Sequence, residues 1–87
     1  MEKIIVRKPT EDEILESTRW PIWEKEPSKF DWHYDEKELC YIIEGEAIVK
    51  TDEEEVSFKQ GDFVIFPKGL SCVWEIKNKI KKHYKFE

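Results

Sequence analysis

From Phe30 to the end of the chain, apolar residues recur at every second position in short stretches that turn residues separate. Phe30, Trp32 and Tyr34 share one parity, and Gly45 falls where two such stretches meet. This alternation is typical of strands that bury one face, and many short strands in series are typical of a sandwich or a barrel. We therefore expect an all-β fold of about nine short strands, with a turn at Gly45.

The N-terminal part of the chain begins with one strand and one helix. Residues 3–8 alternate as a strand does. Thr10, followed three residues later by Glu13, has the form of a capping box, in which each side chain bonds the backbone N–H of the other residue. The pattern predicts one short helix, the only one expected, whose buried residues are Ile14 and Leu15.

A chain of 87 residues has room for one hydrophobic core and therefore for one domain. Residues 1–29 are expected to hold the N-terminal strand, the helix and an extended segment, and residues 30–87 the core of the barrel. The extended segment, residues 20–26, is suited to pair with the edge strand of a neighbouring chain. We therefore expect a homodimer.

Charged residues make up 40% of the chain and aromatic residues 14%, which favours a solvated surface around an aromatic core over disorder. The net charge is -5 at pH 7, and the densest basic group, Lys77, Lys79, Lys81 and Lys82, is interleaved with apolar residues, so nucleic acid is not an expected partner. No apolar run reaches the roughly 18 residues of a membrane span, and no secretory signal is recognised. A cytoplasmic protein with free thiols is expected. Asn and Gln each occur once among many Glu and Lys residues, which favours a thermophilic source.

Two stretches keep the glycine and proline spacing of a known pair of motifs. Glu38 precedes Gly45 with six residues between them, and Gly61 is followed at the full motif spacing by Pro67 and Gly69. These stretches resemble the two cupin motifs, and the chain is most similar to small cupins grouped with ethanolamine-utilisation protein Q and the ureidoglycine aminohydrolases. The resemblance implies a single-domain cupin jelly-roll barrel with a pocket at its mouth, usually a homodimer and often with a divalent metal ion.

Most of the metal-ligand positions of that family carry other residues here. The resemblance puts Glu38 at the ligand position of the first motif, and Cys72 stands where the second motif has its histidine. Trp32 and Tyr34 occupy the places of the His-x-His pair. Catalytic zinc sites use three protein ligands, so we expect no metal cofactor. If a divalent ion does bind, Glu38 and Cys72 are its expected ligands.

Strand alternation, together with the face that looks inward in cupins, predicts a pocket lined by aromatic rings, one acid and two thiols. The expected lining residues are Trp32, Tyr34, Glu38, Cys40, Cys72 and Trp74. The rings and the thiols can equally be ordinary core.

A buried Glu38 is costly unless it is paired, protonated, hydrogen-bonded to Tyr34 or the backbone, or in contact with a ligand or a metal. No inward-facing Lys, Arg or His is expected to balance it. His33 shares the parity of Asp31 and Asp35 and is expected on the solvent face. A longer first-motif spacing would instead make His33 a ligand, and that requires a bulge to reverse the strand parity.

Three functions remain open. We expect a small-molecule-binding barrel in which Trp32, Tyr34, Glu38 and Trp74 hold the ligand by stacking and one carboxylate hydrogen bond. The alternative is a metal-dependent enzyme of aminohydrolase or isomerase type. A third possibility is an assembly protein whose dimer interface is built on exposed aromatic residues around Trp20 and Trp23.

Overall fold

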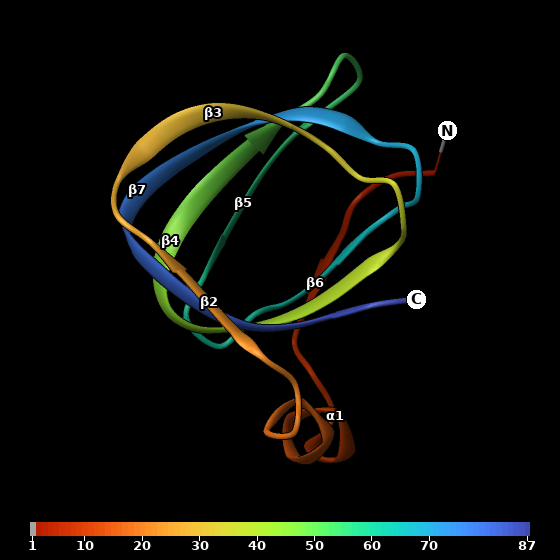
Figure 1. Ribbon diagram of the computed structural model, residues 1–87, viewed down its shortest axis with the longest axis vertical. Helices are drawn as coiled ribbons and strands as arrows, with labels where there is room; N and C mark the ends of the chain where they lie inside the picture. The colour runs from red at the N-terminus through yellow and green to blue at the C-terminus, as the bar shows by residue number, and fades with distance from the viewer. Residues whose placement is uncertain (1) are drawn as a thin grey trace.

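The computed structural model describes residues 2–87, which fold into a barrel of antiparallel strands with one short helix outside it (Figure 1). In chain order the elements are β1 (Ile5–Arg7), α1 (Glu11–Ser17), β2 (Ile22–Lys25), β3 (Ser28–His33), β4 (Glu38–Lys50), β5 (Glu55–Lys59), β6 (Phe63–Phe66) and β7 (Ser71–Phe86). The all-β fold with a single short N-terminal helix is as expected from the sequence.

Two long strands, β4 and β7, form the centre of the barrel. They pair with each other from Glu38 opposite Phe86 to Lys50 opposite Val73. Each also changes its second partner along its length: β4 pairs first with β6 and then with β5, while β7 pairs first with β3 and then with β2. These two strands are 13 and 16 residues long, and each takes the place of two short strands. The described chain therefore has seven strands rather than about nine.

Gly45 lies within β4 and does not end it, which corrects the expected turn. The register between β4 and β7 shifts from Ile42 to Ala47, so the strand bulges here instead of reversing. Gly45 has φ +92°, and a Cβ built on it would meet the carbonyl oxygen of Lys79 and lie 2.8 Å from the Cα of Ile80. The bulge bends β4 between the part that pairs with β6 and the part that pairs with β5. It also lets β7 approach closely, which only glycine permits.

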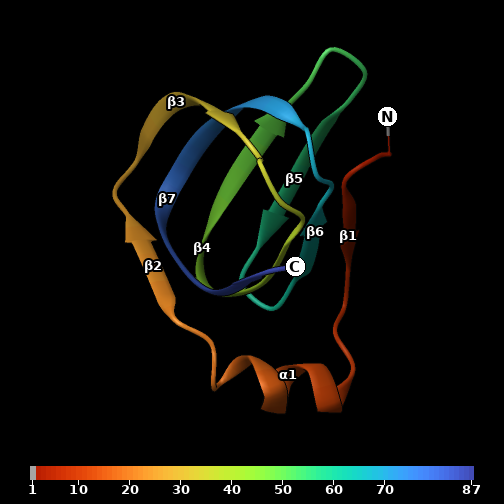
Figure 2. The same cartoon turned by 45° about the vertical axis from the view of Figure 1, so that its right-hand side comes forward.

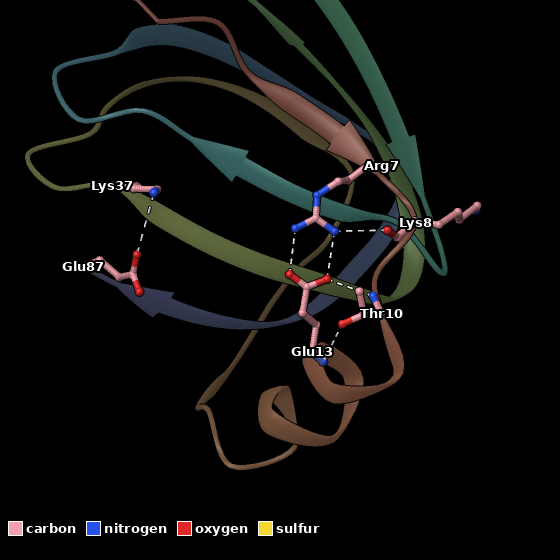
Figure 3. A network of polar contacts seen from close by, with 6 residues as sticks. All are labelled: Arg7, Lys8, Thr10, Glu13, Lys37 and Glu87. Atoms are coloured by element: carbon pink, nitrogen blue, oxygen red, sulfur yellow. Dashed lines mark hydrogen bonds and ion pairs between the residues drawn. The ribbon is translucent and has the colours of Figure 1, made fainter.

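Helix α1 lies at one end of the molecule and links β1 on one side of the barrel to β2 on the other (Figures 1 and 2). The predicted capping box is present, with Thr10 and Glu13 bonding each other's backbone N–H. Arg7 at the end of β1 donates two hydrogen bonds, 2.8 and 2.7 Å long, to the carboxylate of Glu13, as Figure 3 shows. The guanidinium of Arg7 lowers the pKa of Glu13 to about 2. The sequence interpretation was wrong about the buried face of this helix, because Leu15 is 67% exposed and Ser17 is the buried residue.

The ends of the central strands are also fastened. The backbone N–H of Glu87 donates to the carbonyl oxygen of Lys37 at 2.9 Å, and the side chains of the same two residues form an ion pair at 3.8 Å (Figure 3). These contacts hold the end of β7 beside the start of β4. Within residues 2–87, no helix is long and apolar enough to cross a membrane.

The segment around Trp20 and Trp23 pairs within its own chain. Strand β2 lies antiparallel to β7, with Ile22 opposite His83. Trp20 packs against Phe63 at a centroid distance of 6.3 Å, and neither tryptophan is fully exposed. Both tryptophans are therefore half-buried within their own chain rather than fully exposed, and the assembly interface stays a prediction. The homodimer itself stays a prediction, with β2 as the last strand in the order of the sheet.

We predict that Gly45→Ala destabilises the protein more than Gly69→Ala does. Both glycines have positive φ, so each substitution should cost about 1–2 kcal/mol of unfolding free energy from backbone strain. A Cβ at Gly69 meets nothing within 4 Å, whereas one at Gly45 pushes against the backbone of β7, which adds about 1–3 kcal/mol. Urea unfolding of both variants measures the difference. Equal losses would mean that β4 and β7 do not approach as closely as described.

Candidate functional site

One cavity of about 240 Å³ opens into the barrel and is lined almost entirely by aromatic rings. Its lining residues are Trp23, Phe30, Trp32, Tyr34, Glu38, Trp74, Lys82, Tyr84 and Phe86. Trp32 and Phe86 are 50% and 43% exposed, while Tyr34 and Trp74 are buried, so the former pair forms the mouth and the latter the inner wall. The two polar members of the lining, Glu38 and Lys82, are both buried.

Glu38 and Lys82 form an ion pair inside the barrel. The Nζ atom of Lys82 lies 3.0 Å from Oε1 and 3.2 Å from Oε2 of Glu38, so the ammonium donates to both carboxylate oxygens. The side chain of Lys82 is only 6% exposed and that of Glu38 only 4%. Each charge therefore satisfies the other in a place where neither could remain alone without a large desolvation cost.

Lys82 corrects the expectation that no basic residue faces inward. It alternates with Lys81 and His83 along β7 and shares the inward parity of Ile80 and Tyr84. Lys82 thus belongs to the same face as Cys72 and Trp74 earlier in the strand. The signal was present in the sequence as a period of two. The burial of Lys82 does not follow from that period alone, because the carboxylate that compensates its charge lies 44 residues earlier in the chain.

The ammonium group of Lys82 is also surrounded by rings. Its Nζ lies 4.9 Å from the ring centroid of Trp23 and 4.8 Å from that of Trp74, with Phe66 at 5.9 Å. Cations over aromatic faces at these distances are attracted by the ring quadrupole, most strongly where water is excluded. The carboxylate and the rings together hold the cation in one position.

The inner wall of the cavity is rigid because its rings pack on one another. Tyr34 stacks on Phe66 with centroids 4.8 Å apart and planes 9° apart. The indole Nε1 of Trp74 donates to the hydroxyl of Tyr34 at 3.2 Å. Burial, and then the nearby charge of Glu38, raise the pKa of Tyr34 well above its usual value, so this phenol stays protonated. Of the partners considered for Glu38 from the sequence, neither Tyr34 nor the backbone of residues 2–87 supplies the hydrogen bond; the carboxylate accepts instead from the ammonium of Lys82.

Of the six predicted lining residues, the structure brings Trp32, Tyr34, Glu38 and Trp74 together at the cavity, whereas the placement of Cys40 and Cys72 in its wall is corrected. Cys40 is fully buried in the core, with its Sγ donating to the carbonyl oxygen of Val64 at 3.5 Å. Cys72 lines a separate, more open hollow. Both are free cysteines, as expected.

His33 lies on the outside, on the face that its parity predicted. Its side chain is 54% exposed and its Nδ1 lies 2.8 Å from Oγ of Ser71, the residue opposite it on β7. His83 has a structural contact, with Nδ1 3.1 Å from the carbonyl oxygen of Trp20. Neither histidine lines the aromatic cavity.

Comparison with known proteins agrees with this architecture. The model of the EutQ-like cupin domain matches residues 13–84. The chain belongs to the EutQ-like cupin family. A DUF861 family protein from Thermotoga maritima is 43% identical, with a TM-score of 0.93 over 98% of this chain and 100% of that one. No curated protein matches the chain.

Two ethanolamine-utilisation cupins are more distant. A candidate ethanolamine utilization protein Q from Salmonella typhimurium is 25% identical with a TM-score of 0.69, and the match covers 75% of this chain but only 53% of that one. The EutQ protein of Clostridium difficile is 21% identical with a TM-score of 0.70, covering 95% of this chain and 66% of that one. The second likeness concerns the fold alone. These matches confirm the cupin barrel expected from the two motifs.

The cupin fold often holds a divalent metal ion, but the donors of this cupin do not fit one. The carboxylate of Glu38 has both oxygens occupied by the ammonium of Lys82, a cation that would repel a metal ion. Burial raises the pKa of Cys72 to about 11, so the thiol holds its proton at neutral pH. Among residues 2–87, no group of three His, Cys, Asp or Glu side chains lies close enough to hold a metal ion.

We predict that both cysteines of this cupin alkylate slowly in the native state. Burial raises the pKa of Cys40 to about 12 and that of Cys72 to about 11, and only the thiolate reacts. Their reaction with iodoacetamide at pH 8 should be at least about a hundredfold slower than in urea-unfolded protein. The rate at Cys72 should rise about tenfold per pH unit up to pH 11, provided that the fold persists. A plateau of the Cys72 rate below pH 9 would show that its thiol is not perturbed.

Proposed function

We propose that this cupin binds a small, flat organic molecule in the aromatic cavity. The observation that carries the proposal is a cavity whose walls are aromatic rings and which also holds the buried ion pair of Glu38 and Lys82. Ligand pockets are mostly apolar with a few placed polar groups, and this cavity has that composition. A volume of about 240 Å³ corresponds to roughly eight water molecules at about 30 Å³ each, enough for a single-ring compound.

The rings supply most of the binding free energy in this proposal. Trp32 at the mouth meets Tyr34 edge-on, with a centroid distance of 6.4 Å and planes 77° apart. A flat ligand between such rings gains offset-stacked or edge contacts of about 0.5–1.5 kcal/mol per pair beyond the buried area. Because the inner rings already pack on one another, little side-chain entropy is lost on binding.

The ion pair selects the polar part of the ligand. Since the carboxylate of Glu38 and the ammonium of Lys82 balance each other, the cavity carries no net charge that favours a cationic ligand. An uncharged ligand can accept a hydrogen bond from Lys82 or donate one to Glu38. A charged ligand would instead compete with one member of the pair.

The four tryptophans allow a direct test of binding. Trp23, Trp32 and Trp74 line the cavity, whereas Trp20 packs on Phe63 outside it. Titration with benzyl alcohol or benzamide, followed by NMR of the four indole N–H groups, should shift the first three signals and leave that of Trp20 in place. The same concentrations that shift one cavity signal should shift the other two.

Trp32→Ala and His33→Ala are a matched pair of variants for this titration. Both side chains are exposed neighbours on β3, but only Trp32 lines the cavity, so Trp32→Ala should weaken binding by about two- to tenfold and His33→Ala should not. The proposal is wrong if a panel of single-ring compounds moves none of the three signals. It is also wrong if His33→Ala is the variant that loses binding.

A further inference from the structure

Lys82 differs from the other lysines of the chain in its surroundings. Among residues 2–87 it is the buried lysine, only 5% exposed, and it lines the cavity rather than the surface. Surface lysines are strongly hydrated, whereas lysines desolvated in apolar pockets are the ones that form Schiff bases with carbonyl compounds, once a proton acceptor has taken the ammonium proton. The acceptor here is Glu38, with both oxygens within 3.2 Å of Nζ.

We propose that the cavity takes small aldehydes and ketones, and that Nζ of Lys82 joins their carbonyl carbon as a protonated imine. The inference rests on the proposed function, because the cavity must first admit a small molecule. It names the chemical class of that molecule and the residue that reacts with it.

Glu38 can carry every proton that the reaction moves. The carboxylate takes one proton from the ammonium, and the nitrogen lone pair then attacks the carbonyl carbon as the π electrons move to oxygen. That oxygen then takes from Glu38 the proton that the ammonium gave up. The nitrogen, which still carries two protons, passes one of them to the carboxylate. Glu38 then protonates the hydroxyl group, water leaves, and the nitrogen lone pair forms the carbon–nitrogen double bond.

The reaction balances without a further reactant. One ammonium and one carbonyl compound give one protonated imine and one water, and Glu38 ends as the carboxylate that it was at the start. No electron is gained or lost. General acid–base help from one positioned side chain contributes about 10²–10⁴-fold to the rate of such steps.

The surroundings of Lys82 suit the product as well as the starting ammonium. A protonated imine keeps the positive charge on nitrogen, so its attraction to Glu38 and to the faces of Trp23 and Trp74 is retained. Only the short-lived neutral amine loses these contacts.

Reductive trapping tests the inference on the full chain. The protein is incubated at neutral pH with benzaldehyde and sodium cyanoborohydride, and the reduced adducts are located by peptide mass mapping. We expect one benzyl group per chain at Lys82 before the exposed Lys68 is modified, with Lys82 labelled at least about a hundredfold faster. Glu38→Gln should slow the labelling of Lys82 by about a hundredfold and leave that of Lys68 unchanged.

The controls separate the two proposals. Lys82→Arg keeps a cation beside Glu38 but has no amine that can form this imine, so the single fast adduct should vanish while the indole spectrum stays native. Labelling of wild-type protein at Lys68 and other exposed lysines, with Lys82 spared, overturns the imine. If benzyl alcohol still shifts the three cavity indoles in that case, the binding proposal stands. If neither benzyl alcohol nor benzamide shifts the three cavity indole signals and Lys82 is not labelled, both proposals are wrong.

Discussion

The ion pair between Glu38 and Lys82 is the interaction on which the rest of this barrel depends. It joins the two central strands, β4 and β7, which are neighbours in the sheet, and each member would be an uncompensated charge in an apolar site without the other. The ammonium of Lys82 bonds both carboxylate oxygens and faces two indole rings, and these attractions offset the desolvation of the two charges. Among residues 2–87, no buried side-chain nitrogen or oxygen lacks a hydrogen-bond partner. The buried polar side chains of these residues therefore find their hydrogen-bond partners within the chain.

This pair also gives the cavity its chemical character. In this cupin, the carboxylate of Glu38 at the start of β4 pairs with the ammonium of Lys82 in the last strand, β7. The rings of Tyr34, Phe66 and Trp74 pack behind it and hold the inner wall in place. The bulge at Gly45 brings β7 close to β4 just beyond the point where the pair forms. A substitution at that glycine would therefore disturb both the fold and the site.

Much of the fold could be predicted from the sequence, because turn residues and period-two alternation are local signals. The capping box at Thr10 and Glu13 and the N-terminal strand, which the structure places at Ile5–Arg7, are examples. The continuity of β4 through Gly45 could not be read in this way, since a glycine in a bulge and a glycine in a turn look the same without the partner strand. Lys82 was missed because its burial depends on a carboxylate 44 residues away.

A double-mutant cycle on Glu38→Gln and Lys82→Met, measured by urea unfolding, tests the importance of the ion pair most directly. Each single variant leaves one buried charge unpaired and should lose about 3–5 kcal/mol of unfolding free energy. The double variant removes both charges and should lose much less than the sum of the single losses, with a coupling of at least about 2 kcal/mol. Single losses that add to the double loss within about 0.5 kcal/mol would contradict the account, because the two side chains would then not interact in the folded protein.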